Sequence, residues 1–221
     1  MAHTVRITNV SDVTHDVRRI TCEKPDGYTF EPGQATDVAI DKPEWRDEQR
    51  PFTFTSLNSW PGLEFTIKVY PDHDGVTEQI GMLHAGDSLL IDEPWGAIKF
   101  KGQGCFIAGG AGVTPFIAII RDLQSKGELN GNSLVFSNKT ESDIILRSEL
   151  EAAQGLENIF TVTNQSSSEL ARGKIDREFL QKYVASFDQE FYVCGPPKMV
   201  EDVSECLEKL GAKTDSIVFE E

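Results

Sequence analysis

The segment CFIAGGAGVTP, residues 105–115, decides the fold of the second half of the chain. Its apolar start, Cys105–Ala108, predicts a buried strand, and Thr114-Pro115 predicts a helix start, because threonine favours the N-cap and proline the first helical position. The glycine-rich turn 109–112 between them would let backbone amides approach a pyrophosphate at the positive end of the helix. Its spacing, G-x-G-x-x-P, departs from the dinucleotide fingerprint, so this segment alone also fits an ordinary tight turn.

Downstream of this segment, apolar stretches alternate with helical ones as far as residue 219. We predict strands at 105–109, 133–137, 159–163, 191–194 and 216–219, and helices at 115–125, 147–153, 177–184 and 197–210. This alternation predicts a parallel sheet with crossover helices.

Upstream of it, short β-rich segments are separated by turns. They lie at 4–10, 16–22, 35–40, 51–56, 63–70, 88–92 and 97–100. Strands of this length and spacing predict an antiparallel barrel. We place the domain boundary near Phe100–Gln103, where the polar, glycine-rich stretch 101–104 could serve as a hinge, which gives domains 1–101 and 102–221.

Length and charge limit the classes of function. The 221 residues suit two domains of about 100 residues each. Apolar runs stay far below the roughly 18 residues of a membrane span, and the first residues lack the pattern of a secretory signal, so we expect a soluble, cytoplasmic protein. The net charge of −15 speaks against a nucleic-acid partner, because a phosphate backbone would be repelled.

The four cysteines, Cys22, Cys105, Cys194 and Cys206, lie far apart in the sequence. They lack the C-x-x-C pairs of zinc sites and the closer spacing of plant-type iron–sulfur ligands. The sequence therefore indicates neither a metal site nor a disulfide framework.

A second motif, Cys194-Gly195-Pro196-Pro197, ends a predicted strand and begins a predicted helix. Cys194 should lie at the carboxyl edge of the sheet, where open α/β sheets bind their ligands. Taken alone, the motif is more typical of a small buried cysteine before a helix that starts with proline. Together with the glycine-rich turn, it favours a nucleotide site.

A third motif, Arg50-Pro51-Phe52-Thr53, lies in the barrel half. Arginine can pair with a phosphate, an aromatic face can cover an isoalloxazine ring, and a hydroxyl can hydrogen-bond near the reactive ring nitrogen. An edge strand with an exposed Arg50 and a core Phe52 explains the motif equally well.

A fourth motif, Asp74-Gly75-Val76-Thr77, lies between the third motif and the glycine-rich turn. In this order the four motifs resemble those of the ferredoxin–NADP reductase superfamily, and the resemblance covers essentially the whole chain. It implies a Greek-key antiparallel β-barrel that binds FAD, followed by an α/β parallel-sheet domain that binds NAD(P)H. The family usually has glycine where Asp74 stands.

The resemblance also implies roles for single residues. Arg50 would contact the FAD phosphates, Phe52 would pack against the flavin ring after Pro51, and Thr53 would lie near N5. Strand residues Thr66, Ile67 and Lys68 would line the pyrimidine or ribityl side, and Gly75, Val76 and Thr77 would hold the pyrophosphate. On the nucleotide side, Gly110, Ala111, Gly112 and Thr114 would hold NAD(P)H, and Cys194, Gly195 and Pro196 would shape the hydride-transfer pocket.

Thr53 and Cys194 are the candidate catalytic residues, and their expected work is orientation. Hydride transfer to a flavin needs no proton-abstracting group, so the protein supplies orientation and electrostatics. We assign no metal ligand and no catalytic histidine.

The choice between NADH and NADPH depends on the residues just after the second strand of the α/β domain. The run Ser137-Asn138-Lys139 lacks an acid that could bind a ribose 2′-hydroxyl, which favours NADPH. Lys139, Arg172 and Lys174 could surround a 2′-phosphate, although each also fits a solvated surface charge.

Three functions stay open. The first is a monomeric reductase that passes electrons to a separate flavodoxin, ferredoxin or oxygenase component. The second is an NAD(P)H:flavin reductase, which uses flavin as a passing substrate and shares the Arg50-Pro51-Phe52-Thr53 pattern. The third is a subunit that only relays electrons inside a larger complex. Thr77 and its helix favour a tightly held dinucleotide, and the intact glycine-rich turn argues against a vestigial nucleotide site.

The closing segment 217–221 resembles the last strand of the family but lacks the aromatic residue that commonly comes after it. Ile217 and Phe219 share one side of a strand. We expect both to pack into the core, which would leave the flavin face accessible.

Overall fold

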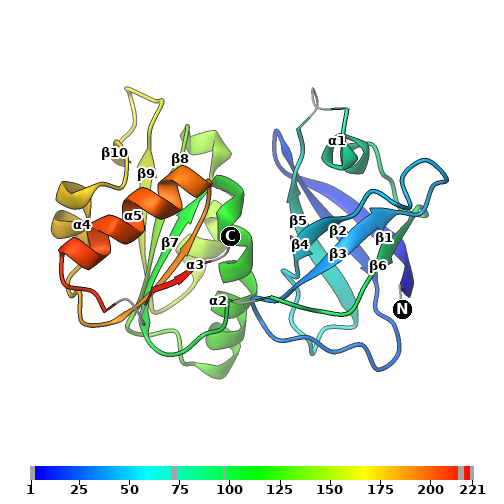
Figure 1. Cartoon of the computed structure of the whole chain (residues 1–221), viewed down its shortest axis with the longest axis horizontal. Coiled ribbons are helices and arrows are strands. Elements are labelled where there is room, and N and C mark those ends of the chain that lie inside the picture. Colours follow the sequence, from blue (N-terminus) through cyan, green and yellow to red (C-terminus); the bar gives the residue numbers. More distant parts are fainter. Residues whose placement is uncertain (1–2, 71–73, 97, 214–216, 220–221) are drawn as a thin grey trace.

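The N-terminal half is an antiparallel barrel. The computed structural model describes residues 3–70, 74–96, 98–213 and 217–219, the last of these by backbone alone. The barrel strands are β1 (His3–Thr14), β2 (Val17–Glu23), β3 (Ala35–Ile40), β4 (Arg50–Thr53), β5 (Gly62–Lys68) and β6 (Ser88–Ile91). They pair in the order β4-β3-β6-β1-β2-β5, and a bridge between Phe54 and Phe65 joins the two ends of the sheet. Helix α1 (Val76–Gly81) lies over one end (Figure 1).

The barrel core is filled by aromatic and aliphatic side chains that alternate along the strands. Phe54 is fully buried and packs on Phe30 at a ring-centroid distance of 4.2 Å and on Phe65 at 5.2 Å. Ile20, Leu63 and related side chains complete this cluster. The core residues of a strand thus lie two positions apart, as residues on one face of a strand do.

The C-terminal half is a parallel sheet covered on both faces by helices. Its strands are β7 (Gly104–Gly109), β8 (Asn132–Asn138), β9 (Leu156–Val162), β10 (Ala171–Arg172), β11 (Glu190–Cys194) and β12 (Ile217–Phe219), in the order β10-β9-β8-β7-β11-β12. The helices are α2 (Thr114–Lys126), α3 (Arg147–Ala152), α4 (Arg177–Tyr183) and α5 (Pro197–Lys209), with 3₁₀ turns η1 (Gly110–Val113) and η2 (Glu141–Asp143).

Alternate residues of the central strand β7 face the two helical layers. Phe106 and Ala108 pack in the cluster that includes α2 and α3, whereas Cys105 and Ile107 pack with α4 and α5. Both halves of the predicted fold class, the antiparallel barrel and the α/β domain, are therefore confirmed. No helix in the described part of the chain combines the length and apolar character needed to cross a membrane.

The connection between the two sheets differs from the expected strand at 97–100. Residues 98–100 form no strand. Ile98 is fully buried in the core of the parallel-sheet domain, and Phe100 stacks on Tyr192 at 5.8 Å. The hydroxyl of Tyr192 accepts hydrogen bonds from the backbone N–H groups of Lys101 and Gly102. Apolar residues that looked like a barrel strand thus attach the connection to the second domain.

The start of α2 also differs from expectation. Thr114 is the first helical residue and not the N-cap, which is Val113. The Thr114 hydroxyl donates to the backbone carbonyl of Ala111 at 3.0 Å, because η1 runs directly into α2 and leaves no extended residue for a side-chain cap. Pro115 lies in the first turn, as predicted.

Candidate functional site

Two adjoining cavities lie where the barrel meets the carboxyl edge of the parallel sheet. One, of about 330 Å³, is lined mainly by the barrel, and the other, of about 690 Å³, mainly by the sheet. Both are lined by Lys68, Tyr70, Ala111, Cys194 and Gly195. We call them the barrel cavity and the sheet cavity.

The barrel cavity combines flat apolar groups with hydroxyls and one cation. Its lining consists of Ala35, Pro51, Phe52, Thr53, Thr66, Ile67, Lys68, Tyr70, Thr77 and Trp95 from the barrel, and Ala111, Thr114, Pro115, Cys194 and Gly195 from the second domain. The ends of β4 and β5, α1 and the start of α2 therefore converge on one space. Tyr70, Trp95 and Ala35 are lining residues that the motifs did not indicate.

Three polar side chains of this cavity have different surroundings. The Thr66 hydroxyl lies 3.2 Å from the hydroxyl of buried Thr55. The Thr53 side chain, 8% exposed, makes no hydrogen bond within the described part of the chain, so its hydroxyl is available to a ligand. Lys68 is held by Asp16 at 2.5 Å. Burial opposes ionisation of Asp16, but the hydrogen bonds from Lys68 and Thr14 outweigh it and lower the pKa of this carboxyl.

The sheet cavity lies at the carboxyl ends of four parallel strands. Its lining includes Gly109–Gly112 after β7, Ser137–Lys139 at and after β8, Thr163 after β9, and Cys194–Pro197 at and after β11, with Asp143 and Met199. The predicted edge of the sheet is thus the cavity edge. Ligands of open α/β sheets bind at this edge.

The glycine-rich turn touches the Cys194 motif directly. A side chain at Gly112 would collide with the carbonyl group of Cys194 and the backbone nitrogen of Gly195, so only glycine allows the two motifs to lie this close. Gly110 has a left-handed φ of +52°, and no atom lies within 4 Å of where its Cβ would stand. Space for a ligand is therefore left on the Gly110 side of the turn.

Asn138 and Asp143 are polar residues of the sheet cavity that the sequence analysis did not select. Asn138 is 5% exposed, and neither atom of its side-chain amide has a hydrogen-bond partner among the described residues. A buried amide without a partner costs free energy, which fits a site where a bound ligand supplies the missing hydrogen bonds. The Asp143 carboxylate accepts bonds from the backbone N–H and hydroxyl of Thr140, both at 2.8 Å, which holds it at the cavity.

Most, but not all, of the predicted site residues line the two cavities. Arg50, Gly75 and Val76 line neither. The Arg50 side chain is 51% exposed and donates to the carbonyl of Gln49 at 2.6 Å, and Val76 is buried in the barrel core. Gly75 precedes α1 and accepts from the backbone N–H of Glu78 at 3.1 Å.

Asp74, the first residue of the fourth motif, has a backbone conformation that is unusual for a residue other than glycine. Asp74 has a φ of +46°, the region in which glycine is favoured, which explains the usual glycine at this position.

Lys139 lines the sheet cavity, whereas Arg172 and Lys174 line a separate depression beside α4. The three cations therefore do not form one cluster. The side chains of Ile217 and Phe219, and all of Glu220 and Glu221, lie outside the described residues.

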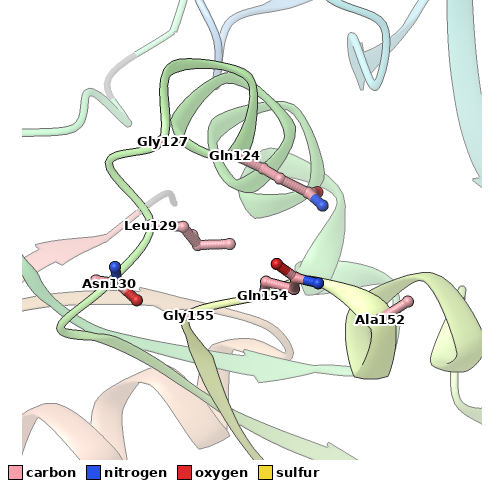
Figure 2. A pocket seen from close by; sticks show the side chains of 7 residues that line it. All are labelled: Gln124, Gly127, Leu129, Asn130, Ala152, Gln154 and Gly155. Carbon is pink, nitrogen blue, oxygen red and sulfur yellow. The ribbon is translucent and has the colours of Figure 1, made fainter.

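A group of three side chains at the edge of the sheet cavity has the spacing of a metal site, and a further cavity lies apart from both the sheet cavity and the barrel cavity. His15, Asp16 and Asp143 bring ligand atoms within 4.8 Å of one another, but the two carboxylates are already bonded to Lys68 and Thr140. A further cavity, of about 470 Å³, lies near the amino ends of β8 and β9 (Figure 2). The residues that line it are Gln124, Gly127, Leu129, Asn130, Ala152, Gln154 and Gly155, with no charged side chain among them.

Comparison with known proteins identifies the domain that carries the sheet cavity. Residues 106–205 match the family model of the oxidoreductase NAD-binding domain. A ferredoxin–NADP reductase from Neisseria gonorrhoeae, solved with FAD and NADP, superposes with a TM-score of 0.87 at 19% identity, over 99% of this chain and 98% of that one. At this identity the superposition shows that the two chains share their fold.

In sequence, the chain is similar to several reductases. It is 29% identical to the reductase component of propane 2-monooxygenase from Rhodococcus jostii over 97% of this chain and 62% of that protein. It is 28% identical to NADH-cytochrome b5 reductase 2 from Aspergillus niger over 90% of this chain and 67% of that protein. The chain thus spans less than two thirds of the first of these relatives.

Proposed function

We propose that this chain is an NAD(P)H-dependent flavoprotein reductase that holds FAD in the barrel cavity and a nicotinamide nucleotide in the sheet cavity. The observation that carries the proposal is that both cavities are lined by Lys68, Tyr70, Ala111, Cys194 and Gly195. Two planar rings bound in adjoining cavities would meet beside Cys194. Hydride transfer requires such an approach, to about 3–3.5 Å between the reacting atoms.

The roles of the side chains follow from their places in the two cavities. Phe52 offers a flat apolar surface for the flavin ring, and the unpaired Thr53 hydroxyl offers a hydrogen bond. Gly110 and Ala111 would receive the nucleotide pyrophosphate through backbone amides, and Cys194 would position the nicotinamide. Arg50, Gly75 and Val76 stay predictions for the FAD phosphates.

When bound, FAD supplies the capacity to take two electrons as a hydride and to release them one at a time. The chain's own residues would orient the two rings and exclude water from the space between them. We propose that the electrons pass to a separate protein, as a flavodoxin, a ferredoxin, an oxygenase component or a haem protein would require. The names of the relatives, a monooxygenase reductase component and a cytochrome b5 reductase, support the last two. A monomer in the cytoplasm stays our prediction from the sequence.

We infer that NADH suits the sheet cavity better than NADPH, although the sequence favoured NADPH. That preference rested on the absence of an acid near the end of β8 and on three clustered cations. Asp143 is an acid in the cavity lining, and only Lys139 of the three cations lines it. A fixed carboxylate would repel a 2′-phosphate and can accept a hydrogen bond from a 2′-hydroxyl.

The experiment that tests the proposal is anaerobic mixing of the purified protein with NADH or NADPH while flavin absorbance is monitored. We expect a yellow protein with one FAD, bleached by NADH, that then reduces a one-electron acceptor. A colourless protein that reduces added flavin would instead support the NAD(P)H:flavin reductase. A yellow protein that neither nucleotide bleaches would support the relay subunit.

A further inference from the structure

Arg121 connects the two domains through a set of short contacts. It lies on α2, and its guanidinium is only 10% exposed. Nη1 donates to the Thr55 carbonyl at 2.5 Å and to Oε1 of Glu64 at 2.7 Å, both in the barrel. Nε and Nη2 donate to the two carboxylate oxygens of Glu149 on α3, at 2.6 and 2.9 Å. One planar cation is thus bonded to both domains at once.

The barrel side of this contact leads back to the flavin cavity. Glu64 is a buried carboxylate on β5, and Oε1 also accepts from the Thr55 hydroxyl at 2.8 Å. That hydroxyl lies 3.2 Å from the hydroxyl of Thr66, which lines the barrel cavity. A continuous chain of polar contacts therefore runs from the barrel cavity to the α2 helix.

One anchored element, β5, lines both cavities through Lys68, and the other, α2, begins directly after the turn η1, which lines the sheet cavity. Arg121 comes seven residues after Thr114, a lining residue at the start of α2, a distance of about 10 Å along a helix. Glu64 precedes Thr66 by two residues, or about 7 Å along a strand. A contact between Arg121 and Glu64 therefore fixes how far β5 lies from the start of α2.

The contact places one guanidinium between two carboxylates, and Nε of Arg19 lies 3.8 Å from Oε2 of Glu64. Burial alone would lower the pKa of the Arg121 guanidinium, but the hydrogen bond to Glu149 and the charge of Glu64 outweigh it, so its pKa is raised. The Trp60 ring covers the cation, with a distance of 5.1 Å from Cζ to the ring centroid. The ion pairs and the aromatic ring thus both stabilise the charged form of Arg121.

We propose that Arg121 is a positioning residue, and that its bridge from Glu64 to Glu149 sets the spacing between flavin and nicotinamide. This inference rests on the proposed function. A bonded chain between β5 and α2 holds the two rings at reacting distance, because β5 lines the barrel cavity and the turn η1, which runs directly into α2, lines the sheet cavity.

The test compares the double variant Glu64→Gln/Arg121→Gln, which removes one charge of each sign from the contact, with Arg121→Lys and with the control Lys126→Gln. Lys126 pairs with Asp122 on the same helix and does not reach the barrel. Flavin bleaching at saturating NADH should slow about tenfold or more in the double variant, while FAD content and the NADH dissociation constant stay near wild type. Arg121→Lys should recover part of the rate, and the control all of it.

X-ray scattering in solution provides a second readout that does not depend on catalysis. The double variant should show a larger radius of gyration than wild type and the control, because the domains lose their bond. Unchanged scattering would overturn the bridge, and altered scattering with a wild-type bleaching rate would overturn its role in positioning. If wild type holds FAD but NADH does not bleach it, the proposed function fails and the scattering still decides whether the bridge exists.

Discussion

Cys194 is a half-buried residue at the point where the two cavities meet. We expect Cys194→Ala to slow flavin reduction by about tenfold with FAD still bound, because a small misplacement of a hydride donor costs rate steeply. Stopped-flow bleaching by NADH measures this rate. Cys206→Ala on α5, outside both cavities, is the control. A wild-type rate in Cys194→Ala would mean that the cysteine is only structural.

Replacing Asn138 should have opposite effects on the stability of the nucleotide-free protein and on its affinity for NADH. Replacing its unpaired amide with leucine should raise the free energy of unfolding of the nucleotide-free protein by about 1 kcal/mol and weaken NADH binding about fivefold. Urea unfolding and NADH titration measure the two effects. Asn132→Leu is the matched control, because its amide donates to Leu129 and accepts from Gly104, so this change should destabilise. Weaker stability in Asn138→Leu would contradict the idea that its amide awaits a ligand.

Asp143 should decide the choice of nucleotide. Asp143→Asn keeps an acceptor for the N–H of Thr140 but removes the negative charge from the cavity lining. We expect kcat/KM with NADPH to rise about tenfold relative to NADH, a change of about 1.4 kcal/mol. Lys174→Glu, in the separate depression, should leave the ratio unchanged. An unchanged ratio in Asp143→Asn would show that Asp143 does not set the preference between NADH and NADPH, and Lys139 would be the next residue to test.

At the scale of elements, the β1–β2 turn is joined to the end of β5 by the pair of Asp16 and Lys68. The pKa of folded Asp16 lies below its ordinary value of 3.8. The stability from this pair is therefore present above pH 3.8 and is lost as the pH falls through the lower folded value. The free energy of unfolding of wild type should exceed that of Asp16→Asn by about 0.5–1 kcal/mol near neutral pH, and the two values should converge as the pH falls below 3.8. Thermal unfolding across this range measures the difference, and a constant gap would contradict the prediction.

At the scale of the whole molecule, Tyr192 attaches the interdomain connection to the second domain. Its hydroxyl accepts from Lys101 and Gly102, and burial raises its pKa. Tyr192→Phe should lower the free energy of unfolding by about 1–3 kcal/mol, because the backbone N–H groups of the connection lose a partner. Tyr183→Phe is the control, since its hydroxyl makes no hydrogen bond within the described residues. Equal stability of both variants would show that the connection is held by the Phe100 stack alone.

The sequence by itself determined the order of the elements and most of the cavity lining. Apolar strands that end in glycine or proline turns can be recognised locally, because the period of burial and the turn residues lie within a few positions of each other. The motifs at Phe52, Gly110 and Cys194 were therefore found, and the structure brings them to adjoining cavities. The expectation of a barrel strand at 97–100 was wrong, because an apolar stretch has the same residue pattern whether it packs in a barrel or on a neighbouring domain.

Only the tertiary structure decided which polar groups line the same cavity or contact one another across the domain interface. Asp143 and Asn138 look like ordinary loop and strand-end residues, and Arg121 like a surface charge on a helix. Whether an amide is left unpaired, a carboxylate faces a cavity or a guanidinium crosses a domain interface depends on residues far away in the chain, such as Glu64 for Arg121. Hydrophobic periodicity records which face of an element is buried, but it carries no information about the partner that buries it.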